Sequence, residues 1–380
     1  MTDFSEIRPY NDVEAKLACE RIARHPMMPV ISKYLLRDMP AGTLSNLFRS
    51  FENVDDFQHE VMVGLVESIL DQTTSSYSVD GINYIKQLGD RKFLSISNHR
   101  DIFMDPLAIQ YFQGRENIGI SEICAGSNLL GNKLLDDLMK SNKMICVKRG
   151  ISPRELYESS KVLSEYIRFS IASGSSSVWI AQREGRTKDG IDKTEQGILK
   201  MLDMSGSGNF QKDFEQLSIV PMSVSYEYEP CDARKAREVL IRRSGQTYVK
   251  KKNEDLHSIL TGIRQNKGHM HIEICKPLSS KEIASAARLS GNERYQALVR
   301  ILDNRIISGY RLWNTNYIAH DILHGEYAHA DMYTRDERTA FESYVDRKVQ
   351  KVSAGLDKSE LRNAFLEIYA NPVDGKASLK

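Results

Sequence analysis

Two kinds of hydrophobic pattern divide this chain. Over residues 10–76, apolar side chains recur at roughly helical spacing and no strand-like alternation appears. The positions that show this spacing are Val13, Leu17, Ile22, Val30, Ile31, Tyr34 and Leu35. Prolines at positions 26, 29 and 40 interrupt the pattern, and a polar stretch at residues 72–76 ends it. The first part of the chain is therefore predicted to be helical throughout.

Beyond residue 76, short strand-like runs alternate with helix-like segments. The runs cover residues 92–97, 144–148, 177–181, 217–226 and 270–275. A helix over 153–172 is the best marked, because Ser152 can cap it, Pro153 suits its first turn and Glu155 completes a capping box. From about residue 292 the chain is helical again, with an apolar stripe formed by Tyr295, Leu298, Ile301, Leu302 and Ile306.

This order of elements predicts an α/β fold, in which helices flank a mixed central sheet and a helical domain precedes it. We expect an N-terminal helical domain over residues 1–78, an α/β domain over 79–330 and a C-terminal helical extension over 331–380.

Composition narrows the classes of function. A formal net charge of +1 over 380 residues gives no general attraction to nucleic acid, so we expect no nucleic-acid partner. The five cysteines are scattered and form no Cys-x-x-Cys pair, which favours reduced thiols in a cytoplasm and argues against a disulfide framework or a zinc site. The acidic start lacks a secretory pattern, and the apolar run at residues 61–70 is too short to cross a bilayer. A soluble or peripheral protein is expected.

The most informative stretch is residues 97–106, which follows the strand-like run ending in Ile96. It carries His99, Asp101 and Asp105. An imidazole takes a proton near neutral pH, and a carboxylate on its other nitrogen fixes the tautomer and stabilises the cation. Asp105 followed by Pro106 also suits a helix start, with the aspartate as N-cap. A proton-transfer site is expected here, and the cap does not exclude it because one carboxylate accepts several hydrogen bonds.

Two later loops carry basic residues after apolar runs. Lys148 and Arg149 end one such run, and the other is followed by Arg183, Glu184, Gly185 and Arg186. Solvent-exposed turns are the simpler interpretation of both. Gly185, however, lets the backbone approach an anion closely, which favours a phosphate-binding role.

Two competing motifs fail. Residues 99–101 match the His-Arg-Asp sequence that begins the catalytic loop of protein kinases. That loop needs an asparagine five positions after its aspartate, and this chain has Pro106 there. The later histidines do not form a protease-type metal motif, so surface or structural roles are expected for them. They are His269, His271, His320, His324 and His329.

Four blocks in order, at residues 97–106, 142–150, 178–187 and 217–223, resemble the glycerolipid acyltransferase superfamily. The helical N-terminal domain makes the soluble plastid-type glycerol-3-phosphate acyltransferases the nearest group. Two departures stand out. Five residues separate His99 from Asp105 where the family has four, so Asp101 is a rival for the family aspartate. The Glu184-Gly185-Arg186 block is one residue tighter than usual, which places Arg183 at the family glutamate position if Arg186 is the family arginine.

The resemblance implies acyl transfer to a hydroxyl, in phospholipid biosynthesis. The donor is acyl-CoA or acyl-carrier protein and the acceptor glycerol 3-phosphate; a 1-acylglycerol 3-phosphate or other lyso-lipid acceptor is the alternative. His99 is then the general base and Asp105 its partner, with no acyl-enzyme, no cofactor and no metal. Substrate binding falls to Lys148, Arg149, Arg183, Glu184, Gly185 and Arg186. Pro221 is expected in a pocket wall or at a strand edge.

A cytoplasmic location is expected, with peripheral contact to the inner face of the membrane allowed. The alternative from another class is a non-catalytic protein that binds lipid or phosphate.

Overall fold

The computed structural model describes residues 2–35, 40, 42–129, 133–251, 254–325 and 327–379. Within these residues, seven strands form one mixed sheet with the order β1-β7-β6-β2-β5-β3-β4. The strands are β1 (Thr74–Asp80), β2 (Leu94–Ser97), β3 (Glu122–Gly126), β4 (Met144–Val147), β5 (Val178–Ala181), β6 (Val220–Tyr226) and β7 (Gly268–Ile274). β6 and β7 pair antiparallel, and every other neighbouring pair is parallel. The predicted α/β fold with a mixed central sheet is confirmed.

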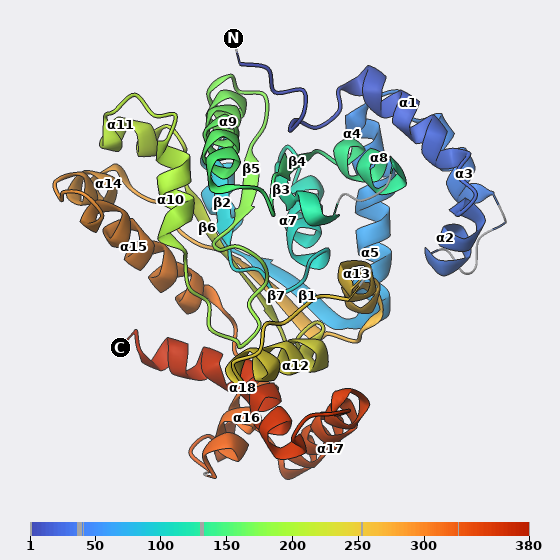
Figure 1. Cartoon of the computed structure of the whole chain (residues 1–380), viewed down its shortest axis with the longest axis vertical. Coiled ribbons are helices and arrows are strands. Elements are labelled where there is room, and N and C mark those ends of the chain that lie inside the picture. The colour runs from blue at the N-terminus through green and yellow to red at the C-terminus, as the bar shows by residue number, and fades with distance from the viewer. Residues whose placement is uncertain are drawn as a thin grey trace.

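Helices cover both faces of the sheet, so the molecule has three layers there (Figure 1). One face packs against α9 (Pro153–Ala172), α10 (Gln196–Asp203), α11 (Phe210–Glu215), α14 (Ser280–Ala287) and α15 (Glu293–Gly309). The other packs against α5 (Gly64–Thr73), α6 (Asn83–Lys86), α7 (Met104–Arg115) and α13 (Glu254–Arg264). Successive strand residues serve opposite faces, as strand geometry requires. In β5, Val178 and Ile180 join the first core and Trp179 joins the second.

Two helical groups stand at the ends of this layered unit (Figure 1). The N-terminal group consists of α1 (Asp12–Ala23), α2 (Met28–Leu35), α3 (Thr43–Ser50), α4 (Val54–Asp56), the π-helix η1 (Phe57–Val63) and α8 (Lys133–Ser141). The second group consists of α12 (Asp232–Arg243), α16 (Asn314–His324), α17 (Arg335–Val352) and α18 (Lys358–Ala377). Two 3₁₀ turns, η2 (Ser127–Leu129) and η3 (Ala330–Met332), complete the described elements. The predicted boundary at 330–331 falls between α16 and α17, which pack in the same group.

Local signals placed several elements accurately. The helix expected at 153–172 is α9, and Ser152 and Glu155 form its capping box. The helices expected through residue 76 end at Thr73, because residues 74–80 pair with β7 as strand β1. The helix break expected at Pro40 extends to Ala41, which lies outside the described residues.

Pro221 lies in the interior of the sheet, because β6 is paired on both sides. The expectation of a strand-edge proline is therefore wrong. Its carbonyl accepts a hydrogen bond from the Cys275 amide at 2.9 Å.

None of the helices in the described residues combines the length and apolar character that crossing a bilayer requires.

Candidate active site

Five strands deliver their following loops to one edge of the sheet. β2, β3, β4 and β5 run parallel, and β6 runs parallel to β2. The carboxyl ends of parallel strands share an edge, where ligands bind in open α/β sheets. The loop with His99 follows β2, Arg149 follows β4, and Arg183 and Arg186 follow β5. The sheet thus brings the loops that carry these residues to one edge.

His99 and Asp105 are in direct contact. Nδ1 of His99 lies 2.9 Å from Oδ2 of Asp105, which belongs to the first turn of α7. The Asp105 side chain is fully buried, whereas 14% of the His99 side chain is exposed. A carboxylate on Nδ1 leaves Nε2 as the ring nitrogen free to meet a reacting group.

Three further donors hold the Asp105 carboxylate. Oδ2 accepts hydrogen bonds from the backbone N–H groups of Arg100 and Asp101, at 2.5 and 2.8 Å. Oδ1 accepts one from the Tyr226 hydroxyl at 2.6 Å. Burial, and then the charge of Asp105, raise the pKa of Tyr226 well above its ordinary value, so the hydroxyl keeps its proton and remains a donor. The carboxylate that contacts His99 is thereby fixed on both oxygens.

Asp101 does not contact His99 in this way but binds backbone amides at the start of α7. Its Oδ1 accepts hydrogen bonds from the backbone N–H groups of Phe103 and Met104, each at 2.8 Å. These bonds satisfy free amides at the start of α7, which is what a helix cap does. The prediction that Asp105 caps this helix is therefore wrong, because Asp101 does so while Asp105 faces His99.

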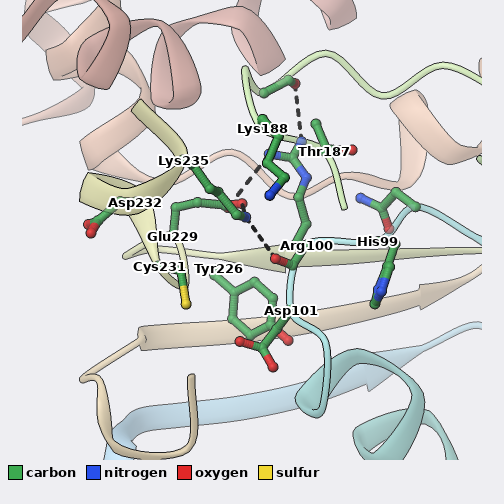
Figure 2. Close-up of polar contacts among 12 residues, drawn as sticks. His99, Arg100, Asp101, Thr187, Lys188, Tyr226, Glu229, Cys231, Asp232 and Lys235 are labelled. Carbon is green, nitrogen blue, oxygen red and sulfur yellow. Dashed lines mark hydrogen bonds and ion pairs between the residues drawn. The ribbon is translucent and has the colours of Figure 1, made fainter. Parts of the chain in front are cut away.

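A buried ionic network lies beside the His99 loop (Figure 2). The Arg100 guanidinium donates to Asp192 at 2.6 Å and to the Gly190 carbonyl at 3.1 Å, and lies 3.6 Å from Glu229. The Lys235 ammonium donates to Glu229 at 2.5 Å and to the Arg100 carbonyl at 2.7 Å. Buried charges are tolerated when they are paired in this way. The network holds the main chain next to His99 through both the side chain and the carbonyl of Arg100.

Asn98 joins this loop to the rest of the sheet. Its side-chain amide donates to the Val224 carbonyl at 3.0 Å and its oxygen accepts from the Val224 N–H at 2.7 Å. The same amide donates to the Asp192 carboxylate at 2.9 Å. This carboxylate also accepts a hydrogen bond from the Thr187 hydroxyl. The Thr187 N–H in turn donates to the His99 carbonyl at 2.7 Å. The loop after β5 is thus bound directly to the loop that carries His99.

Arg149 and Glu184 meet across the edge of the sheet. An Arg149 guanidinium nitrogen lies 3.3 Å from the Glu184 carboxylate, and about a third of the Arg149 side chain is exposed. The Arg149 guanidinium also lies against Gly126, where a Cβ would come within 2.7 Å of its Nε. A glycine at that position therefore makes room for this side chain.

Arg186 and Lys188 concentrate positive charge beside the His99 loop. Arg186 is only 9% exposed, and its Nη1 has no hydrogen-bond partner among the described residues. Lys188 donates to Glu238 at 2.6 Å. Burial, and then the charge of Arg186, lower the pKa of Lys188 to about 8. A buried guanidinium nitrogen without a partner suits an anionic ligand, and Gly185 adopts a positive φ of 70° just before it.

The other predicted binding residues lie apart from this cluster. Lys148 forms an ion pair with Glu6 at 2.6 Å. The Arg183 Nε lies 3.9 Å from Glu195 and faces an open cavity of about 810 Å³. Its lining also includes Lys193 and Arg300, but neither His99 nor Asp105.

Tyr226 is a site residue that sequence reasoning missed, and its role is testable through stability. We expect Tyr226→Phe to lower the free energy of unfolding by about 1–3 kcal/mol, because it leaves a buried carboxylate oxygen of Asp105 without its donor. Urea unfolding followed by circular dichroism would measure the loss. Tyr84→Phe, at a side chain 37% exposed, is the matched control and should change it by less than about 0.5 kcal/mol. Equal values for the two variants would contradict the assignment.

Comparisons with known proteins add a distant relationship. No protein-family model matches the chain. Dihydroxyacetone phosphate acyltransferase of Mus musculus is 21% identical over 272 residues, which cover 69% of this chain and 39% of that protein. The Homo sapiens protein of the same name is 21% identical over 249 residues, covering 63% of this chain and 35% of its own length. The chain thus spans well under half the length of these relatives. The similarity to these acyltransferases is distant.

Proposed function

We propose that this chain is an O-acyltransferase that moves a fatty acyl group from a thioester donor to a hydroxyl of a small phosphorylated acceptor. The observation that carries the proposal is the His99–Asp105 pair, with one imidazole nitrogen held by a buried carboxylate. The basic residues on the same edge of the sheet and the distant similarity to dihydroxyacetone phosphate acyltransferases support it. A protein that merely binds lipid or phosphate has no need of this pair.

In the proposed reaction, Nε2 of His99 takes the proton of the acceptor hydroxyl as that oxygen attacks the thioester carbonyl. The C–S bond then breaks, and the proton passes from the imidazolium to the departing thiolate. The Asp105 carboxylate stabilises the imidazolium between these steps. No acyl-enzyme forms, so the site needs no serine or cysteine nucleophile.

We assign the acceptor phosphate to Arg186 and Arg149. Arg186 has a buried nitrogen without a partner among the described residues and follows Gly185, whose φ is positive, and Arg149 is partly exposed. Glycerol 3-phosphate and dihydroxyacetone phosphate share a phosphate and a primary hydroxyl on three carbons, so both fit this chemistry. Glycerol 3-phosphate is our first choice, and a lyso-lipid acceptor is the alternative.

An acceptor panel tests the proposal. Purified protein is given palmitoyl-CoA, or palmitoyl-acyl-carrier protein, with glycerol 3-phosphate, dihydroxyacetone phosphate, 1-acylglycerol 3-phosphate or glycerol. Release of free thiol and the acylated product are both measured. We expect acceptor-dependent release with at least one phosphorylated acceptor and little with glycerol. Binding of these acceptors without thiol release from either donor would instead indicate a non-catalytic binding protein.

Arg149→Ala is expected to raise the KM for the phosphorylated acceptor about ten- to a hundredfold and to change that for the acyl donor much less. A hydrogen bond to a charged group contributes about 1.5–3 kcal/mol. Arg149→Lys should restore only part of the loss, because an ammonium cannot make the two-pronged guanidinium contact.

Arg91→Ala is the control, because Arg91 is exposed and precedes β2 at the opposite end of that strand. Steady-state kinetics with each substrate varied separately distinguishes the outcomes. A rise confined to the acyl-CoA KM would mean that Arg149 holds the nucleotide phosphates instead. If neither KM changed, Arg149 would bind neither substrate and would only form part of a solvent-exposed turn.

A further inference from the structure

A group of histidine and aspartate side chains lies on the C-terminal helices, outside the candidate active site. His320 and His324 are one turn apart on α16, so they share a face of that helix. Asp374 belongs to α18, which packs along α16 (Figure 1). These three residues bring a carboxylate and two imidazoles together from two helices.

The distances within this group suit a single metal ion. Nε2 of His320 lies 3.3 Å from Oδ1 of Asp374. The candidate ligand atoms of His320, His324 and Asp374 all lie within 4.8 Å of one another. A tetrahedral ion with bonds of about 2.0–2.2 Å separates its ligand atoms by about 3.3–3.6 Å. The group therefore needs only a small inward movement to surround an ion.

The second ring nitrogen of His324 is arranged as it is in metal-binding histidines, and that of His320 lies near a carboxylate. Nδ1 of His324 lies 2.9 Å from the His320 carbonyl oxygen, so this nitrogen carries the proton and Nε2 keeps its lone pair. Nδ1 of His320 is buried, has no hydrogen-bond partner among the described residues, and lies 3.8 Å from Oδ1 of the buried Asp321. Metal ligands commonly donate this N–H to a backbone carbonyl or a carboxylate.

The nearby alternatives are weaker. His320, Asp321 and His329 also lie close together. The Asp321 carboxylate, however, already accepts hydrogen bonds from the Tyr333 hydroxyl at 2.7 Å and from the backbone N–H of His329. A third group on β1 and β7 includes Asp80, but the Arg311 guanidinium lies 3.2 Å from that carboxylate. A cation in that position opposes a metal ion.

We propose that His320, His324 and Asp374 bind one divalent transition-metal ion, Zn²⁺ being the best match to two imidazoles and a carboxylate. The proposal departs from the surface or structural roles that the sequence suggested for these histidines. It does not depend on the proposed acyltransferase function.

The ion would join α16 to α18. α18 in turn contacts the loop after β5 at residues 189 and 190. The Asn371 side chain donates to the Asp189 carbonyl at 2.7 Å. A Cβ on Gly190 would lie 2.3 Å from the Ile368 carbonyl oxygen, which shows how closely the loop approaches α18. A structural tie between these helices therefore supports the loop that also carries Asp192.

Metal titration of the tag-free full chain after EDTA treatment tests the proposal. Calorimetry with Zn²⁺, and visible absorption with Co²⁺, should both give one ion per chain, with a tetrahedral Co²⁺ spectrum. We expect His324→Gln and Asp374→Asn each to weaken binding by at least about tenfold, because loss of even an outer-shell partner costs about 10–100-fold. Zn²⁺ should raise the unfolding temperature of the unmodified chain more than that of either variant.

His257→Gln is the matched control, since this exposed histidine lies on α13 rather than on α16 or α18. It should bind the ion as the unmodified chain does. Asp374 is 56% exposed, so its substitution tests binding without threatening the fold. Absence of stoichiometric binding, or equal affinity in all the variants, would overturn the proposal.

Discussion

His99→Ala is expected to abolish most acyl transfer, lowering kcat by about 10²–10⁴-fold, because removal of a general base costs this much in rate. The reason lies in the geometry of one ring. Nδ1 is occupied by the buried Asp105, so Nε2 is the nitrogen that meets the acceptor hydroxyl. Alanine removes that nitrogen and leaves no neighbouring base in the same position. The rate of acceptor-dependent thiol release measures the effect.

The same variant should remain folded, because part of the His99 side chain is exposed and the loop is held by other contacts. Asn98 bonds to Val224, and the Thr187 N–H donates to the main-chain carbonyl of residue 99, which alanine retains. His269→Ala serves as the control and should keep its activity. A folded His99→Ala protein with near-normal thiol release would refute the proposed mechanism.

Five of the seven described strands were predicted from their apolar residues, and β1 and β3 were not. β2, β5 and β6 are buried over nearly their whole length, and their apolar residues identified them. β1 lies at one edge of the sheet and has the polar sequence TSSYSVD, which resembles a boundary between domains. β3 begins with Glu122, whose pKa burial raises to about 7, and only two of its five residues are buried. Their strand character comes from neighbours distant in sequence, which composition cannot reveal.

The contacts of the candidate site are likewise of two kinds, some between residues close in sequence and others between residues far apart. The contact between His99 and Asp105 spans six residues, so a strand followed by a polar loop and a helix start was enough to suggest it. Tyr226 reaches Asp105 across 121 residues, and Arg100 reaches Asp192 across 92. No local pattern distinguishes these side chains from ordinary core or surface residues.

The basic residues show a further limit of sequence reasoning. Lys148 and Arg149 are adjacent in the chain, yet Lys148 pairs with Glu6 and Arg149 with Glu184. Neighbouring side chains on an extended segment point in opposite directions, so only one of them can serve a given site. The residue type was predictable, but the partner of each depended on the fold.

The two aspartates of the loop offer the sharpest test of the proton-transfer arrangement. We expect Asp105→Asn to lower kcat by about 10²–10⁴-fold and Asp101→Asn by less than about tenfold. An asparagine at 105 is almost the same shape and can still accept the backbone N–H bonds, but it carries no negative charge to stabilise the imidazolium. At 101, the amide oxygen still accepts from Phe103 and Met104, so the start of α7 is preserved.

Activity and stability must be measured on the same preparations, because both carboxylates are buried. If Asp105 acts through His99, the activity of Asp105→Asn falls far more than its stability, and adding Asp105→Asn to His99→Ala costs little further rate. Two residues that act as one unit are non-additive in this way. A purely structural Asp105 would instead lower activity only in proportion to unfolding and would add its full cost on top of His99→Ala. Small and equal effects at positions 101 and 105 would show that neither carboxylate supports the base.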